Sequence, residues 1–292
     1  MNIFSIIEEL EKVDPELNDR FSPRRAAIKN ITSFGSKVAV AALPFAFATL
    51  FKRAYGQAVG DIGNVNGVLN FALKLEYLEA AFYTQGVATT NLIAAADLAS
   101  ITVIRDHEKA HVALLQGALG AAAVPQSGQG VNGVYDFTTS FPTVFTNYDT
   151  FLAVANALED TGVRAYKGQA PNLIGNPVLT TALNIHSVEA RHAAHIRQIR
   201  QKRGGAAATL KPWISGSASV SNDTGIGAAV DGNYGAGVSG YPAENNTTQG
   251  GVNITTLAAV SGTTSITAAI EAFDEPLDYV SVFNLVKGFG VK

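Results

Sequence analysis

Two quartets of residues indicate how this chain folds: Glu108-Lys109-Ala110-His111 and Glu189-Ala190-Arg191-His192. Both have the form Glu-x-x-His, and a lone glutamate precedes each of them by about thirty residues. Glu76 lies 108 − 76 = 32 residues before the first quartet, and Glu159 lies 189 − 159 = 30 residues before the second. The stretch from 76 to 192 therefore repeats one pattern twice.

The spacing within this pattern is helical. Residues i and i+3 project side by side from a helix, so a carboxylate and an imidazole at that spacing can bind one metal ion. Each lone glutamate also precedes a tyrosine by seven residues, which is about two helical turns, so Tyr83 shares a face with Glu76 and Tyr166 shares a face with Glu159. The sequence therefore predicts four helices whose polar side chains meet in one core.

Four such helices contribute six candidate metal ligands, which are Glu76, Glu108, His111, Glu159, Glu189 and His192. A set of this kind holds two ions in the core of a four-helix bundle, with carboxylates bridging between the ions. Carboxylate oxygens with one imidazole per ion favour iron or manganese over zinc, and the chain has no cysteine to supply a thiolate. We therefore expect two Fe or Mn ions per chain.

Further side chains are candidates for supporting roles around these ligands. Glu79 lies one turn after Glu76 on the same face and either replaces it as a ligand or lies beside the metal site. His195 lies one turn after His192 and is placed to hold a bridging carboxylate or a water. The two tyrosines are core aromatics by default, and the alternatives are a hydrogen bond from each phenol to a metal-binding carboxylate or a redox relay.

Three other polar residues near the pattern are not expected to bind a metal. Asp160 follows Glu159 directly, but it points about 100° around the helix from it. His107 and His186 are expected on the surface or behind the ligands.

Composition excludes several other kinds of function. The net charge is only −3 and the basic residues are scattered, so we expect no nucleic-acid partner. Without cysteine the chain forms no disulfide, no thiolate metal site and no cysteine nucleophile. A hydrophobic content of 47% over 292 residues is enough for one substantial core with an appendage.

Residues 1–58 are expected to form a leader. Arg24 and Arg25 precede an apolar run of fourteen residues, 38–51, which is too short for a membrane span of about 20 residues. Small residues that end at Ala58 suit a cleavage site, and the paired arginines resemble a twin-arginine export signal. We therefore expect an exported protein of the periplasm or cell envelope. The alternative is a retained apolar core helix in a cytoplasmic protein.

The helical bundle is expected to occupy residues 59–205. The connection at 121–146 has no helical pattern, and its length suits a crossover between parallel helices. A Gly/Thr/Asn-rich extension follows at 206–292, with short strands possible at about 252–267 and a final helix at about 277–287. The first two bundle helices are predicted at about 65–85 and from a cap at Thr90 or Asn91 to 119. The third is predicted from a cap at Asn147 to 167, and the fourth from a cap at Asn176, with Pro177 at the first helical position, to 203.

Four segments resemble the ferritin-like proteins related to plant desiccation-related protein. They are Leu75-Glu76-Tyr77-Leu78-Glu79-Ala80-Ala81-Phe82-Tyr83, Asp106-His107-Glu108-Lys109-Ala110-His111, Val188-Glu189-Ala190-Arg191-His192 and Phe273-Asp274-Glu275-Pro276-Leu277. The resemblance extends over about 64–204 and reaches the C-terminal part only at 273–277. It implies an all-α, ferritin-like four-helix bundle with one long crossover.

The resemblance also implies roles for single residues and a class of reaction. Glu76 and Glu159 look like terminal ligands, Glu108 and Glu189 look like bridging carboxylates, and one histidine caps each metal. A protein of this kind is expected to react with dioxygen, Fe(II) or hydrogen peroxide, as a ferroxidase or a manganese catalase does. The alternative is a structural or stress-protective envelope protein that the metals stabilise without turnover. A homo-oligomer is possible in either case.

Overall fold

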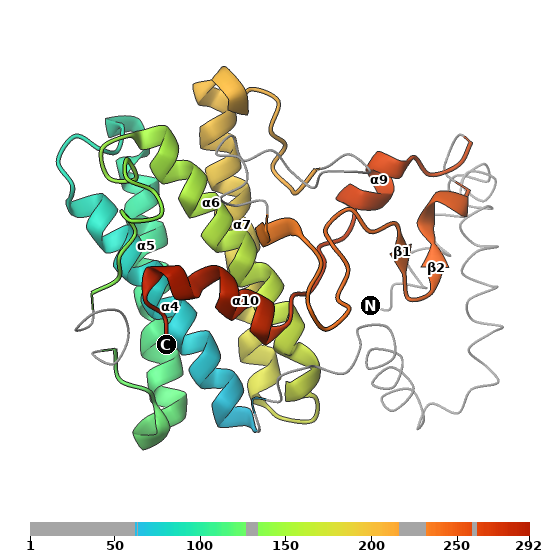
Figure 1. The fold of residues 1–292 in the computed structure, drawn as a ribbon, viewed down its shortest axis with the longest axis horizontal. Coiled ribbons are helices and arrows are strands. Elements are labelled where there is room, and N and C mark those ends of the chain that lie inside the picture. The colour runs from blue at the N-terminus through green and yellow to red at the C-terminus, as the bar shows by residue number, and fades with distance from the viewer. Residues whose placement is uncertain (1–61, 63, 127–133, 216–231, 259–261) are drawn as a thin grey trace, which may run out of the picture. The chain divides into compact units, whose positions relative to one another are not determined.

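The computed structural model describes residues 62, 64–126, 134–215, 232–258 and 262–292. Four long helices form its main body: α4 (Val65–Ala88), α5 (Ala95–Leu119), α6 (Tyr148–Gln169) and α7 (Val178–Arg203) (Figure 1). α4 packs mainly against α5, and α6 packs mainly against α7. The predicted all-α bundle is confirmed. The expected leader, 1–58, lies outside the described residues.

Asparagine side chains cap two of the helix starts, and the cap at Asn147 is the one that the sequence predicts. The side chain of Asn64 accepts a hydrogen bond from the backbone amide of Gly67 at the start of α4, and Asn147 accepts one from Thr150 at the start of α6. The end of α7 also agrees with the sequence, because Gly204 has a φ of 80° directly after a cationic last turn. These boundaries depend on local chemistry that is visible in the sequence.

Other boundaries differ from the prediction. α5 begins at Ala95 and not at a cap of Thr90 or Asn91, because Asn91 adopts a φ of 62° and forms part of a turn. Pro177 takes the capping position of α7 and not the first helical one, while Asn176 accepts a hydrogen bond from the amide of Val178. α4 and α6 each continue a few residues further than expected, to Ala88 and Gln169.

The long connection between α5 and α6 is a crossover. The hydroxyl of Tyr148, at the start of α6, donates to Asp97 Oδ2, near the start of α5, over 3.1 Å. Arg203, the last residue of α7, pairs with Asp149 near the start of α6. α6 and α7 are therefore antiparallel. α5 and α6 therefore run in the same direction, as the sequence predicts.

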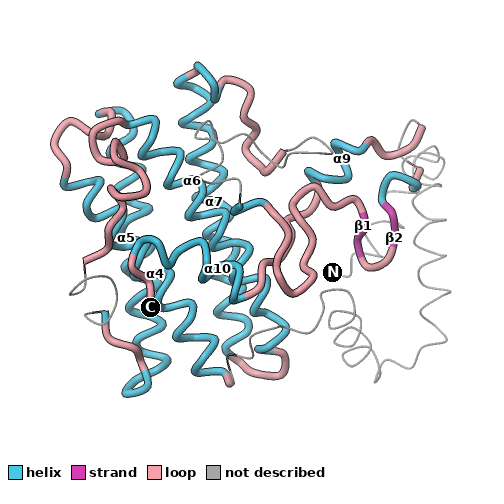
Figure 2. The backbone as a smooth tube through the Cα atoms, viewed as in Figure 1, coloured by secondary structure: helices cyan, strands magenta, loops and turns pink. Residues whose placement is uncertain are grey.

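The C-terminal part contains only short elements. In its described residues these are the strands β1 (Thr248–Gln249) and β2 (Val252–Asn253), the helices α9 (Ile266–Glu271) and α10 (Tyr279–Val286), and 3-10 turns at Gly232–Tyr234, Ile254–Thr256 and Lys287–Phe289 (Figure 2). The strands overlap the predicted strand region at 252–253 only. α9 was not expected, and α10 is shorter at both ends than the predicted helix at about 277–287.

Arg164 on α6 fixes this C-terminal part to the bundle. Its guanidinium is fully buried and donates to the backbone carbonyls of five residues, which are Asn233, Gly235, Pro242, Glu275 and Pro276. One turn further along α6, a Cβ on Gly168 would lie 2.0 Å from the carbonyl oxygen of Leu277. The chain before α10 therefore lies directly on the backbone of α6.

Asp160 has a structural partner. It forms an ion pair with Arg197 of α7, whose Nη1 lies 2.8 Å from Asp160 Oδ1, and it accepts a hydrogen bond of 2.6 Å from the hydroxyl of Tyr234. The prediction that Asp160 points away from Glu159 agrees with this geometry. Asp160, Arg197 and Tyr234 together therefore join α6, α7 and the C-terminal part.

Candidate metal centre

The six predicted ligands meet at the middle of the bundle. α4 supplies Glu76, α6 supplies Glu159, and α5 and α7 each supply one Glu-x-x-His pair. All four glutamates are 0% exposed, and the exposed fractions of His111 and His192 are 9% and 4%. These six polar side chains are thus buried in the core of the bundle, although water would solvate them on a helix surface.

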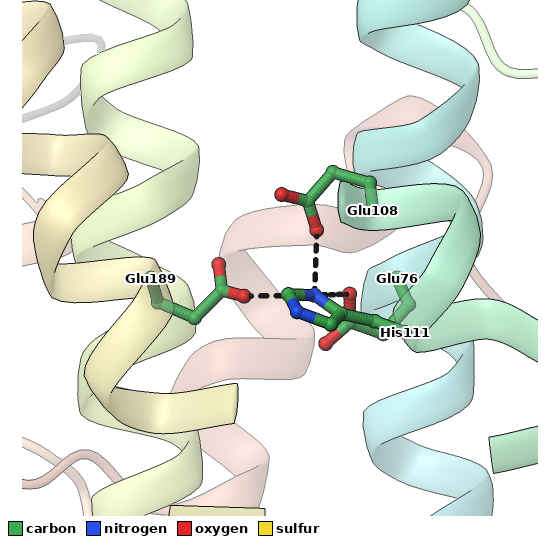
Figure 3. Close-up of side chains that lie close together, drawn as sticks. All are labelled: Glu76, Glu108, His111 and Glu189. Atoms are coloured by element: carbon green, nitrogen blue, oxygen red, sulfur yellow. Dashed lines mark hydrogen bonds and ion pairs between the residues drawn. The ribbon is translucent and has the colours of Figure 1, made fainter. Parts of the chain in front are cut away.

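His111 lies at the centre of the first group of side chains (Figure 3). Its Nδ1 atom is 3.2 Å from one oxygen of each of three carboxylates, Glu76, Glu108 and Glu189. These carboxylates come from three different helices. Potential ligand atoms of the four residues lie within 4.8 Å of one another.

The second group lies around His192, which contacts two of its three carboxylates. The Nδ1 atom of His192 is 2.9 Å from Glu108 Oε1 and 3.2 Å from Glu159 Oε2. Glu108, Glu159, Glu189 and His192 again place potential ligand atoms within 4.8 Å of one another. Glu108 and Glu189 belong to both groups, so the two groups are neighbours that share two carboxylates.

The donor atoms fit metal cations. Both oxygens of Glu189, and Oε1 of Glu108, are buried without a hydrogen-bond partner among the described residues. His192 Nδ1 is close to Glu108 Oε1, and His111 Nδ1 is close to Glu189 Oε1, but both contacts have an ion-pair distance without hydrogen-bond geometry. Carboxylate oxygens buried in this way are costly unless a cation compensates them. Each group of three carboxylates and one imidazole is therefore suited to a metal cation.

The electrostatics of the cluster favour added positive charge. Burial raises the pKa of Glu76 and Glu189 well above the usual value, and the neighbouring carboxylates add to the rise. Burial acts to lower the pKa of both histidines, but contacts with the carboxylates outweigh it and raise the pKa of His111 to about 12 and that of His192 to about 11. Burial acts to raise the pKa of Glu108, yet contacts with both imidazoles lower it to about 2. Bound metal cations would supply the charge that protons otherwise supply here.

Each tyrosine of the repeated pattern bonds to the glutamate of the other half. The hydroxyl of Tyr83 donates to Glu159, and the hydroxyl of Tyr166 donates to Glu76. Both phenols are buried, and burial followed by the charge of the bonded glutamate raises the pKa of each. The tyrosines therefore remain protonated donors that orient the two glutamates present in only one group each.

We expect Tyr83→Phe and Tyr166→Phe to weaken metal binding without abolishing it. Loss of a hydrogen bond that orients a ligand lowers metal affinity by about 10- to 100-fold. Tyr77→Phe is the matched control, because Tyr77 is also buried on α4 but donates to the carbonyl of Val124. Titration of each variant against a competing chelator measures the affinities. Equal affinities in all three variants would show that the phenols do not support the ligands.

Glu79 is a fifth buried carboxylate in this core. It is 3% exposed, and burial followed by the charge of Glu189 raises its pKa. α6 makes room for it through Gly162, where a Cβ would lie 3.5 Å from Glu79 Oε1 and 3.2 Å from Glu189 Oε2. Glu79 belongs to neither four-residue group, whereas Glu76 does. The structure thus places Glu79 beside Glu189 and leaves Glu76 among the potential ligands.

The remaining histidines have different surroundings. His107 is exposed, and its Nδ1 lies 3.0 Å from His192 Nε2, with the two rings stacked. The sequence could have indicated that His107 lies near the clustered side chains, because His107 precedes His111 by four residues and i and i+4 share a helix face. His195 Nε2 and His186 Nε2 are buried without a hydrogen-bond partner in the part of the chain that the structure describes. No hydrogen bond therefore connects His195 Nε2 to the six clustered side chains.

The comparison with known families agrees with this geometry. A family described as a ferritin-like domain matches residues 63–202, which include all four bundle helices except the last residue of α7. A search among curated proteins gives no match. The relation to plant desiccation-related protein stays a prediction.

Proposed function

Residues 63–202 are a ferritin-like domain, and on that premise we propose that the protein is a di-metal oxidoreductase. The proposed centre holds two iron or manganese ions and reacts with dioxygen, Fe(II) or hydrogen peroxide. The observation that supports this most is the sharing of Glu108 and Glu189 between two groups of potential ligands. Two separate metal sites would not require shared carboxylates.

The residues have distinct tasks in this proposal. Glu108 and Glu189 reach both groups and would bridge the ions, while Glu76 and Glu159 would each hold one ion. The imidazoles of His111 and His192 complete one group each through Nδ1. A bound pair of such ions supplies two electrons to one oxygen–oxygen bond.

The surroundings of the centre limit what can reach it. The four glutamates are fully buried, so bulk water does not compete for their oxygens. Two phenols hold Glu76 and Glu159 in fixed orientations. The accessible side is at α5 and α7, where exposed His107 contacts His192. A small reactant fits this arrangement better than a large one.

Metal analysis together with turnover measurements tests the proposal. We expect two Fe or Mn ions per purified chain, and aerobic oxidation of Fe(II) or disproportionation of peroxide by the same sample. A metal that raises the melting temperature strongly, without either reaction, would favour the structural role instead. Absence of metal even after reconstitution would contradict both functions. None of the helices in the described residues has the length and hydropathy of a membrane span.

A further inference from the structure

A small apolar cavity of about 30 Å³ lies between the bundle helices, at the end where α4 begins and α5 ends. Its walls include Val68, Leu115 and Ala182. Of all its lining residues, only Tyr166, Gln169 and Thr181 have a polar side-chain atom. A buried water occupies roughly 10–15 Å³ of such space and needs 2–4 polar partners. The cavity is therefore large enough for a diatomic molecule but poorly suited to water.

The internal repeat allows the two ends of the bundle to be compared. Residues of α6 correspond to residues of α4 at an offset of 159 − 76 = 83, and residues of α7 correspond to residues of α5 at an offset of 189 − 108 = 81. Three residues of the cavity lining correspond to larger side chains at the opposite end, which are Phe151 for Val68, Phe82 for Ala165 and Ile101 for Ala182. Other lining residues correspond to smaller ones, such as Val154 for Phe71 and Gly86 for Gln169.

The three larger side chains fill the opposite end. Phe82 and Phe151 stack with their ring centroids 4.8 Å apart, and both are 0% exposed, as is Ile101. The cavity end has smaller side chains at all three corresponding positions. At these positions one half of an otherwise repeated core is open where the other half is packed.

The cavity ends next to the candidate metal centre. Tyr166 lines it and donates from its hydroxyl to Glu76, and Leu75, the residue before Glu76, is another part of its wall. A molecule in the cavity would contact the ring of Tyr166, whose phenol holds a predicted ligand. Two of the three polar residues in the lining already have hydrogen-bond partners, because Tyr166 donates to Glu76 and Gln169 accepts from Asn172. Few polar atoms therefore remain to bind a polar reactant such as peroxide.

We propose that this cavity holds dioxygen beside the metal centre, an inference that rests on the proposed function. Dioxygen is apolar and diatomic, so it matches both the lining and the size. The volume is far below the roughly 300 Å³ of a pocket for an organic ligand. The proposal therefore names dioxygen and not an organic molecule as the occupant of this cavity.

Xenon binding and oxygen kinetics of the full-length protein test the proposal. Xenon occupies dry apolar cavities, so we expect one xenon beside Ala182 in crystals of the wild type under xenon pressure. Ala182→Ile introduces the residue that the other half of the repeat has, and Ala182→Val adds fewer atoms in case isoleucine prevents folding. Ala99→Ile is the control, because the same substitution falls on an exposed position of α5.

The expected result for Ala182→Ile is loss of the xenon site and a several-fold higher KM for dioxygen, with kcat and the metal content unchanged. Ala99→Ile should behave like the wild type in every measurement. Absence of xenon from the wild type, or an unchanged KM in the filled variants, would overturn the oxygen proposal while leaving the di-metal function intact. A metal-loaded wild type that consumes no dioxygen with Fe(II) would instead overturn the proposed function itself.

Discussion

Glu108→Ala and Glu189→Ala are each expected to abolish binding of both metal ions. Each of these carboxylates belongs to both four-residue groups, so its loss removes a ligand from two ions at once. Glu76→Ala and Glu159→Ala should leave at most one ion, because each of these residues belongs to one group only. The metal content of purified and reconstituted variants, measured by elemental analysis, gives the stoichiometry.

The same variants should lose the stabilisation that metal provides. Binding contributes about 2.7 kcal/mol per site at a free metal concentration of roughly 100 times Kd. Without metal, alanine removes a buried carboxylate from a crowded group, so a large loss of stability is not expected. Melting temperatures with and without metal separate these two effects.

Glu79→Ala is the matched control for this series. Glu79 is a buried glutamate of the same core, but it lies outside both groups. It should retain two ions. Retention of two ions by Glu108→Ala or Glu189→Ala, or their loss from Glu79→Ala, would contradict the ligand assignment.

Arg164→Met is expected to destabilise the protein by about 3 to 5 kcal/mol, because it removes one partner from a buried charged network. The change leaves Glu244, which lies 3.0 Å from Arg164 Nε, without its cationic partner, and it leaves several backbone carbonyls without their donor. Chemical denaturation measures the free energy of unfolding. Limited proteolysis should show cleavage after residue 206 at protease concentrations that leave the wild type intact.

Arg203→Met controls for the loss of an arginine. Arg203 pairs with Asp149, but the two side chains are 32% and 68% exposed. Such exposed pairs contribute about 0.2–1 kcal/mol. If Arg164→Met cost no more than Arg203→Met, the buried guanidinium would not be what fixes the C-terminal part to α6.

Errors in the sequence-based helix boundaries have local causes. Asn91 suits a helix cap by residue type, but it also tolerates a positive φ, and the chain uses it in a turn before α5. The short helix α9 has only six residues, too few to show a helical period in sequence. By contrast, Asn147 was correctly predicted as a cap because its side chain bonds to an amide three residues later.

The sequence by itself determined the four helices of the bundle and the faces on which the clustered side chains lie. Local spacing is enough for this, because a helix places i and i+3 side by side whatever surrounds it. The two Glu-x-x-His pairs and the two lone glutamates could therefore be identified before any contact between helices was known.

Only the tertiary structure decided which groups meet across the bundle. Tyr83 shares a helix face with Glu76, but two turns separate them by about 10.8 Å, so its hydroxyl bonds instead to Glu159 on the antiparallel helix α6. Three other features likewise depend on the tertiary structure. They are the contact of His107 with His192, the carbonyls around Arg164 and the cavity beside Ala182. Each depends on how separate helices pack, and the spacing of residues along one helix does not contain that information.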